Sequence, residues 1–311
     1  MDRIPKVDLH IHSIYSDGSH TPSQIVLNAK KKEIDLIALT DHNTFSGVPK
    51  FRSACKKYKQ KGIAGIEIST KYKDKEIHLL GYFNLNMDFR SKDFSQLKKI
   101  LKNYKNIKKN QNEAIIQKMI DVGRYDISIS EFYSFAKTVS PDENYNRVHI
   151  AKYMVYKGLV DSVDQAFDYI GDGCDFFVDK ETVSLGKAIK AIRAGHGFAV
   201  IAHVGEYNFL PDELELFFNF CKNNGVHGFE CFHPSHDLIN INAIINNTLN
   251  TIDTSSSNYN FLLTIGSDFH GNGQGDNIGK ICEFEMDEEL TNIYNLCCMK
   301  TYKKLEGFIC I

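Results

Sequence analysis

The sequence predicts an α/β protein in which seven short strands form a barrel and a small helical domain interrupts that barrel. Three observations support this fold. Seven short segments have the apolar composition of buried strands, helix signals lie between several of them, and the strand pattern stops from 91 to 181. Alternating strands and helices are typical of a parallel sheet. An open doubly wound sheet is the alternative, but no glycine-rich dinucleotide loop supports it, so we favour the closed barrel.

The predicted strands are short and rich in leucine and β-branched residues, as buried strands are. They cover residues 7–12, 36–40, 63–69, 77–82, 198–203, 228–232 and 262–266. Two helices between them have clear end signals. Thr21 and Pro22 supply a cap and a first-turn proline for one helix, and Pro211 opens another that Gly225 closes.

The interrupting segment is predicted to be an inserted helical domain. Its first helix has apolar residues at helical spacing, namely Phe94, Leu97, Leu101, Tyr104 and Ile107. Further on, a helix ends at Gly158, and Ser162 and Gln165 have the spacing of a capping box. We therefore expect a barrel from 1–90 and 182–311 and an inserted cap domain from 91–181.

Lysines are frequent on the first helix of this insert. They fit a solvated helix face better than contact with a polyanion, so we assign them no function. They are Lys98, Lys99, Lys102, Lys105, Lys108 and Lys109.

The composition limits the function classes. The 311 residues have 42% hydrophobic residues and a formal net charge of -2, which predicts a folded chain without the positive field that holds long duplex nucleic acid. The apolar runs are far shorter than the roughly 18 residues that span a bilayer. The opening MDRIPKVDLH lacks the apolar core of a signal peptide, so we expect a cytoplasmic chain without membrane contact. Eight cysteines without a C-x-x-C pair indicate neither a zinc knuckle nor a disulfide framework.

Histidines and carboxylates gather at the predicted strand boundaries. The first strand reads VDLHIHS, which places His10 and His12 on one side of the strand. In a parallel barrel the carboxyl ends of the strands meet at one mouth, so side chains far apart in sequence can converge there. This convergence predicts a metal cluster, whereas separate structural roles for each residue would require many coincidences. The other candidates are Asp17, His42, Glu67, His78, His203, Asp268 and His270.

Six motifs carry a resemblance to a known family. DLHIHSIYSDG, ALTDHNT, GIEIS, IHLLGY, IAHVG and GSDFHG resemble, in this order, the motifs of the polymerase and histidinol phosphatase (PHP) family of metallophosphoesterases. RVHIAKYMVYKGLV and ECFHPSH are similar to motifs of the subgroup that acts on nucleoside 3',5'-bisphosphates and short 5'-phosphorylated oligonucleotides. The resemblance spans nearly the whole chain and implies a distorted seven-stranded (βα)7 TIM-like barrel with metals at its C-terminal mouth.

The resemblance also implies the metal ligands. One ion would be held by His10, His12, Glu67 and Asp268. A second would be held by the bridging Glu67 with His78 and His203. A third would be held by Asp17, His42 and His270. Such mixed nitrogen and oxygen donors suit two to three ions of manganese, iron or zinc. Asp41 either orients a neighbouring ligand or caps a strand.

The predicted activity is phosphoester hydrolysis, in which Asp17, His42, Glu67, His203 and Asp268 take part. Three divalent cations and the three carboxylates leave a local surplus of positive charge that attracts an anion. Neighbouring metals can share one hydroxide for attack on phosphorus. We expect a small phosphorylated nucleotide as substrate, with removal of the 3'-phosphate from nucleoside 3',5'-bisphosphates and trimming of short oligonucleotides. A histidinol-phosphate phosphatase and a metal-binding regulatory module without turnover are the alternatives.

Residues around the mouth are expected to bind the rest of the substrate. Arg147, at the start of a helix in the insert, can grip a second phosphate. His236 resembles a phosphate-contacting histidine of the subgroup, and His149 and His233 are weaker candidates. The chain departs from the family pattern where Val204 replaces a usual proline, where His196 replaces a common glycine, and in a segment at 238–260 that is longer than usual. None of these departures removes a proposed ligand.

Overall fold

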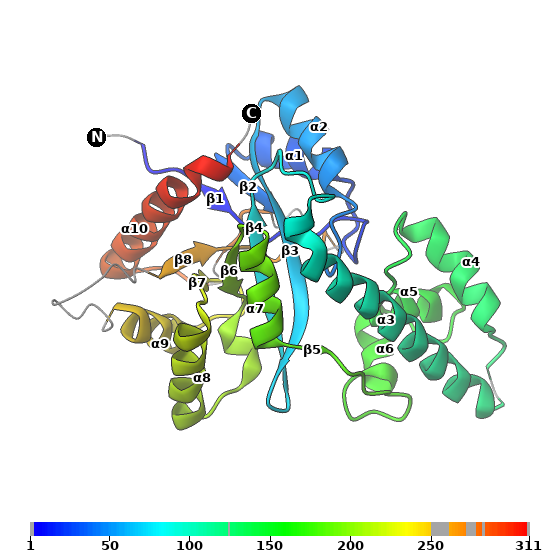
Figure 1. Cartoon of the computed structure of the whole chain (residues 1–311). Coiled ribbons are helices and arrows are strands. Elements are labelled where there is room, and N and C mark those ends of the chain that lie inside the picture. Colours follow the sequence, from blue (N-terminus) through cyan, green and yellow to red (C-terminus); the bar gives the residue numbers. More distant parts are fainter. Residues whose placement is uncertain (1–2, 124, 250–260, 272–277, 282–283, 310–311) are drawn as a thin grey trace.

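The computed structural model describes residues 3–123, 125–249, 261–271, 278–281 and 284–309, and its centre is one twisted sheet (Figure 1). Seven strands follow one another in the order β1-β2-β3-β4-β6-β7-β8, and β5 pairs with β3 beside this path. The strands are β1 Val7–Asp8, β2 Leu36–Leu39, β3 Lys61–Tyr72, β4 Lys75–Phe83, β5 Val183–Ser184, β6 Phe198–Ile201, β7 Gly228–Phe232 and β8 Leu262–Ile265.

The sheet is nearly closed into a barrel, as predicted. The Leu9 amide donates to the Ile265 carbonyl at 2.9 Å, and Ile11 forms a parallel bridge with Phe269. The chain beyond β1 therefore meets the chain around the end of β8. β1 itself is shorter than the predicted strand, because the Thr40 hydroxyl replaces a backbone partner by accepting from the Ile11 amide at 2.9 Å.

The expectation of an all-parallel sheet was wrong at β4, which runs antiparallel to both of its neighbours, β3 and β6. Only Lys73 and Asp74 separate β3 from β4, whereas a parallel connection needs a crossover of about a dozen residues or more. Lys73 takes the left-handed conformation, with φ 54°, that such a tight turn uses. The reversal brings the amino-terminal half of β4 to the same mouth as the carboxyl ends of its neighbours.

Ten helices are formed by the described residues, and the predicted end signals mostly hold. Thr21 and Gln24 form a capping box at the start of α1, and Gly225 ends α8 with φ 75°. At α6 the Ser162 hydroxyl caps the helix, but Gln165 accepts from the Asp161 amide rather than from Ser162. The helices are α1 Pro22–Lys31, α2 Val48–Tyr58, α3 Ser95–Asp121, α4 Ile129–Val139, α5 Arg147–Tyr156, α6 Val163–Ile170, α7 Leu185–Ala194, α8 Pro211–Asn224, α9 Leu238–Leu249 and α10 Glu288–Leu305.

Two hydrophobic cores lie at the two ends of α3. Leu97, near its start, packs into the barrel core, which α7 also covers by packing on β3, β4 and β6. Ile115 and Met119, near its end, belong to a second core that α4, α5 and α6 complete. Figure 1 shows these helices gathered on one side of the barrel. Because α3 contributes to both cores, the exact division of the chain at 91 and 181 stays a prediction.

Two of the departures from the family pattern lie in the described part. His196 has φ 59°, a conformation that favours glycine, and Val204 is buried at the start of the turn after β6. Of the segment at 238–260, α9 covers the first part, and the remainder lies outside the described residues.

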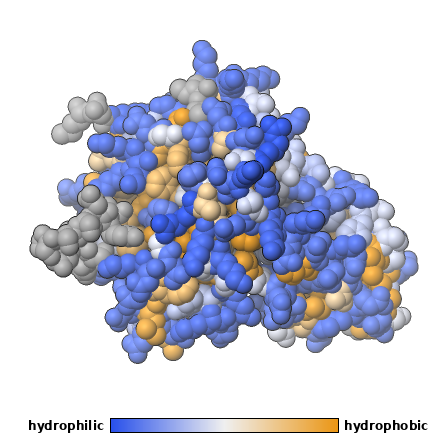
Figure 2. Space-filling view, in the orientation of Figure 1, coloured by the Kyte–Doolittle hydropathy of each residue, from blue (hydrophilic) through white to orange (hydrophobic). Residues whose placement is uncertain are grey.

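The outer surface is mainly hydrophilic, with apolar residues in small groups on the face that Figure 2 shows. No helix in the described part of the chain combines the length and the apolar character needed to cross a membrane.

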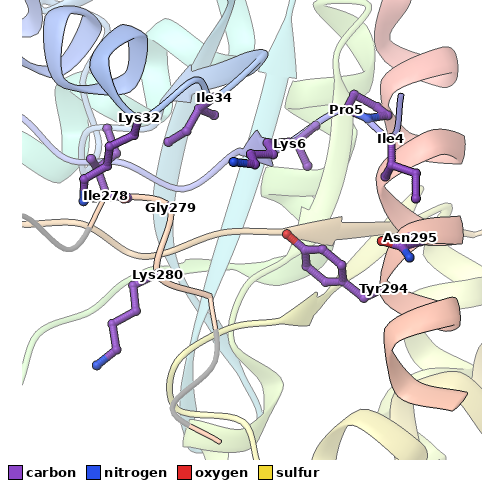
Figure 3. A pocket seen from close by; sticks show the side chains of 11 residues that line it. Ile4, Pro5, Lys6, Lys32, Ile34, Ile278, Gly279, Lys280, Tyr294 and Asn295 are labelled. Atoms are coloured by element: carbon purple, nitrogen blue, oxygen red, sulfur yellow. Dashed lines mark hydrogen bonds between the residues drawn. The ribbon is translucent and has the colours of Figure 1, made fainter. Parts of the chain in front are cut away.

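A cavity of about 630 Å³ lies at the end of the barrel away from the strand ends discussed below (Figure 3). The residues just before β1 and β2 line it, among them Lys6 and Lys32, with Tyr294 facing them from α10. This is the amino-terminal end of these parallel strands. In barrels of this kind the chemistry takes place at the opposite, carboxyl end.

Candidate metal centre

All nine predicted metal ligands lie together at one mouth of the barrel. His10 and His12 follow β1, and Asp17 lies in the loop after them. The remaining members come from β3 and β4 and from the segments that follow β2, β6 and β8, namely His42, Glu67, His78, His203, Asp268 and His270. His78 belongs to this end only because β4 is reversed.

Glu67, on β3, is the centre of the cluster, because nitrogens of five histidines lie within 3.2 Å of its carboxylate. Burial alone would raise the pKa of Glu67, but the neighbouring His42 and His10 outweigh burial and hold this pKa well below its ordinary value. Oε2 lies 3.2 Å from His10 Nε2, 3.1 Å from His12 Nε2 and 3.1 Å from His42 Nδ1, and Oε1 lies 2.9 Å from His78 Nδ1 and 3.1 Å from His203 Nε2.

The two aspartates extend the cluster on either side of Glu67. Asp268 Oδ1 lies 3.0 Å from His12 Nε2 and 3.3 Å from His10 Nε2. Asp17 lies 3.4 Å from His270 Nε2 and 3.6 Å from His42 Nε2. The donor atoms fall into groups whose members lie within 4.8 Å of one another, namely His10, His12, Glu67 and Asp268; His12, Asp17, His42 and His270; and His42, Glu67 and His78.

The first group has the same members as the first predicted ligand set, and the second adds His12 to the third set. The predicted set of Glu67, His78 and His203 is also compact, since His78 Nδ1 lies 3.3 Å from His203 Nε2. Ligands at about 2.1 Å from a tetrahedral ion are about 3.4 Å apart. The observed separations therefore suit donors arranged around shared ions.

Buried atoms without hydrogen-bond partners give an independent test of metal binding. Such orphaned atoms are costly and rare in folded proteins. Eight of the eleven found among the described residues lie in this cluster or beside it. A divalent cation would satisfy six of the eight, namely His10 Nε2, His12 Nε2, Asp17 Oδ1, His42 Nδ1, Glu67 Oε2 and Asp268 Oδ1. The other two, His203 Nδ1 and His233 Nε2, face Glu206 and Asp268 instead.

Several of these histidines turn their second ring nitrogen to an outer partner. His10 Nδ1 contacts the buried Glu230 at 3.1 Å, and His203 Nδ1 lies 3.2 Å from Glu206. His270 Nδ1 donates to the Asp268 carbonyl at 2.7 Å, which leaves its Nε2 free for a ligand role. Metal-binding histidines are held in this way in proteins.

Sequence reasoning missed Glu230. It lies on β7, is completely buried, and also accepts from the His203 amide at 2.9 Å. A glutamate inside the buried run GFECF was the available signal, since an acid in a buried strand needs a specific partner. Glu230 adds a fourth carboxylate at the edge of the cluster and so reduces the local surplus of positive charge.

Asp41 holds the loop that follows His12. Its carboxylate accepts from the Ser13 amide at 2.7 Å and from the hydroxyls of Ser13 and Ser16, both at 2.8 Å. Ser16 Oγ in turn lies 3.4 Å from His12 Nδ1. Of the two roles considered, orientation of the ligand-bearing segment therefore fits better than a strand cap.

The insert is fastened to this cluster by residues that the sequence did not single out. Asn146 caps α5 with its side-chain oxygen, and its amide nitrogen donates to Asp17 Oδ2 at 2.8 Å. Asn144 donates to the His42 carbonyl at 2.7 Å, and Lys152 donates to the Asp17 carbonyl at 2.9 Å. Asn146 directly precedes the helical segment RVHIA, so its role as a helix cap could be predicted from the sequence. Its contact with Asp17 depends on tertiary structure and could not.

Two of the histidines predicted to contact the substrate already have hydrogen-bond partners within the protein. His236 is buried, accepts from the Gly205 amide with Nε2 and donates to the Cys231 carbonyl with Nδ1. Burial lowers the pKa of His236 to about 4. His149 is also buried and accepts from the Asn146 amide, which completes the cap of α5. These contacts favour structural roles.

A pocket of about 180 Å³ separates the cluster from the insert. Asp17, His42 and His78 line its barrel side, and residues of α3 and α5 line the other. Arg147 borders it, with its guanidinium paired to Asp172 and stacked 5.3 Å from the centre of the Phe177 ring.

Lys108 corrects the expectation of a solvated lysine face. Five of the six lysines of that run are exposed, but Lys108 is buried and lines the pocket beside Lys180. Burial lowers the pKa of Lys108 well below its ordinary value, and the Lys180 ammonium lowers it further. Lys180 is paired with Glu76 at 2.8 Å. Two buried lysines thus lie together beside one carboxylate, which is paired with Lys180.

This barrel, with its mouth of histidines and carboxylates, is the scaffold of a metal-dependent hydrolase acting on phosphoester bonds. The chain belongs to the PHP family, whose PHP domain matches residues 8–215.

Known proteins similar to this chain agree with this class. A 5'-3' exoribonuclease of Haemophilus influenzae is 34% identical over 204 residues, which are 65% of this chain and 70% of that protein. A 3',5'-nucleoside bisphosphate phosphatase of Chromobacterium violaceum is 25% identical over 270 residues, 86% of this chain and 88% of that protein. The structure of an amidohydrolase from Chromobacterium violaceum shares the fold, with a TM-score of 0.78 and 23% identity over 98% of this chain and 97% of that one.

Proposed function

We propose that this protein removes the 3'-phosphate from nucleoside 3',5'-bisphosphates and also trims short 5'-phosphorylated oligonucleotides. The observation that carries the proposal is the cationic wall of the pocket beside the metal cluster. Lys108, Lys180 and Arg147 line this wall, and Glu76 and Asp172 are the carboxylates paired there. A substrate with one phosphate at the cluster could place a second phosphate against these basic side chains.

The similarity to known proteins supports the same substrate class. The relatives described above include one named for a bisphosphate substrate and one named for exoribonuclease activity. Histidinol phosphate carries a single phosphate, so a substrate of this kind would not explain why a buried pair of lysines faces the cluster.

We further propose that the centre holds two to three ions of manganese, iron or zinc, on the ligands His10, His12, Asp17, His42, Glu67, His78, His203, Asp268 and His270. Bound there, divalent cations polarise phosphoryl oxygens and supply a nucleophile at neutral pH by lowering the pKa of water. The chain's own residues fix the donors. Glu230 and Glu206 orient two of the imidazoles, and Asn146 holds Asp17.

A substrate panel tests the function directly. The purified protein with added Mn²⁺ is offered adenosine 3',5'-bisphosphate, a 5'-phosphorylated trinucleotide, histidinol phosphate and p-nitrophenyl phosphate. We expect kcat/KM to be at least about tenfold higher for the bisphosphate than for histidinol phosphate, with adenosine 5'-monophosphate as the product. A preference for histidinol phosphate, or release of the 5'-phosphate, would contradict the proposal.

The cationic wall gives a second prediction. Lys108→Met should raise KM for the bisphosphate about 10–100-fold, because a hydrogen bond to a charged group contributes roughly 1.5–3 kcal/mol. KM for p-nitrophenyl phosphate should change little, since that substrate has no second phosphate. Arg147→Ala should show the same asymmetry. Steady-state kinetics on both substrates measure it.

Lys102→Met is the matched control, because Lys102 is exposed on the same helix. It should behave as wild type with both substrates. Equal changes of KM for the two substrates in Lys108→Met would argue against a phosphate contact at this wall.

A further inference from the structure

His233 lies directly after β7, and one side of its ring is already occupied. The side chain is buried, with 3% of its surface exposed. Its Nδ1 accepts from the Ser235 amide at 3.1 Å and contacts the Ser235 hydroxyl at 2.7 Å. Since a backbone amide only donates, Nδ1 carries no proton, and the ring proton is on Nε2. His233 therefore presents a donor, rather than a lone pair, from Nε2.

The Nε2–H group of His233 faces the carboxylate of Asp268, a proposed metal ligand. His233 Nε2 has no hydrogen-bond partner, and it lies 3.7 Å from Asp268 Oδ2. The other oxygen of Asp268, Oδ1, is the one that faces His10 and His12. A movement of about half an ångström would turn the contact with His233 into a hydrogen bond.

Asp268 needs such a partner. Its backbone has φ 49°, a left-handed conformation that is uncommon for residues other than glycine. A quarter of its side-chain surface is exposed, at 25%, so burial does not fix the carboxylate. Ligating carboxylates in proteins are themselves hydrogen-bonded, and these outer contacts set how well the metal is held.

A fourth metal site at this place fits less well. His10, Glu230 and His233 form a compact group of donors. However, Glu230 already accepts from His10 Nδ1 and from the His203 amide, and the proton on His233 Nε2 blocks its lone pair.

We propose that His233 is a positioning residue whose Nε2–H holds Asp268 Oδ2, so that Oδ1 stays directed at the metal cluster. The proposal rests on the metal-ligand role of Asp268 given under the proposed function. It adds a residue that acts through Asp268 and does not touch the substrate.

Two substitutions separate this role from a role in the turn. Asparagine in His233→Asn can still accept from the Ser235 amide, but it lacks any group at the Nε2 position. Glutamine in His233→Gln carries an amide donor at the Nε2 position and does not reproduce the turn contact. Mn²⁺ affinity, measured by electron paramagnetic resonance on the full chain, is the main readout. The melting temperature and kcat with p-nitrophenyl phosphate accompany it.

We expect His233→Asn to weaken Mn²⁺ binding and to lower kcat about 10–100-fold with an unchanged melting temperature. His233→Gln should stay within about threefold of wild type in both measurements. Ser235→Ala, which keeps the backbone amide, is the control and should bind Mn²⁺ as wild type does.

Wild-type Mn²⁺ affinity in His233→Asn would overturn the proposal. Equal losses in the Asn and Gln variants would show that a donor at the Nε2 position does not restore the function of His233, and would overturn the proposal as well. If the wild-type protein binds Mn²⁺ but hydrolyses no phosphoester, the proposed function fails, while the comparison of Mn²⁺ affinities still decides the role of His233.

Discussion

Glu67→Gln is expected to reduce phosphate release at least about 1,000-fold while the chain still folds. Both carboxylate oxygens of Glu67 face histidine nitrogens within 3.2 Å, so no other single side chain is shared by so many donors of the cluster. Glutamine has almost the same shape, but its amide nitrogen offers no lone pair to a cation and it carries no charge. Loss of several kcal/mol of metal-assisted stabilisation corresponds to this factor.

The measurement combines kcat for p-nitrophenyl phosphate with the metal content found by mass spectrometry. Both should fall in Glu67→Gln, and circular dichroism should match wild type. Glu215→Gln, at an exposed position of α8, removes the same charge away from the mouth and should leave both values unchanged. Activity above a tenth of wild type, with full metal content, would refute a central role for Glu67.

Removal of the metal is expected to lower the melting temperature by roughly 6 °C. A ligand present at about 1,000 times its Kd stabilises the folded state by about 4 kcal/mol, and each kcal/mol corresponds to about 1.5 °C in a chain of 311 residues. The physical origin is the set of six buried polar atoms at the mouth that face the proposed ions and regain partners when cations are bound.

Differential scanning calorimetry of protein treated with a chelator, then dialysed, checks this expectation. Re-addition of Mn²⁺ should restore the melting temperature, whereas Ca²⁺, which prefers an all-oxygen shell, should restore little of it. In Glu67→Gln the response to Mn²⁺ should be much smaller. A melting temperature unaffected by chelation in the wild type would mean that protein contacts alone satisfy these atoms.

The gathering of the candidate ligands at one mouth could be predicted because most of them lie at or just beyond a predicted strand boundary, where the barrel itself brings residues together. His10 and His12 share one side of a short extended segment, and His42 and His203 follow buried strands, so local pattern and barrel geometry were sufficient. His78 lies in the cluster, as expected, although the direction of its strand was not foreseen. The two-residue turn between β3 and β4 determines that direction.

The residues that were missed make their contacts through tertiary structure alone. Glu230 contacts His10, which is 220 positions away, and Asn146 contacts Asp17, which is 129 positions away. Lys108 lies in a run of lysines whose other members are exposed, and only the packing of α3 against the barrel distinguishes it. Sequence periodicity gives the face of a helix, but it does not indicate what lies opposite that face.

The continuous helix α3 sets limits on how substrates reach the centre. Leu97 anchors it in one core and Ile115 in the other, while Tyr104 and Lys108, between these anchors, form part of the ceiling over the histidines. A hinge motion of α3 away from the histidines would require either a break in the helix or the separation of one of the two packed cores. We therefore expect the height of the entrance to be constant during turnover. Under the function proposed above, a slot of fixed height would suit single nucleotides and loose strand ends better than the middle of a long polymer.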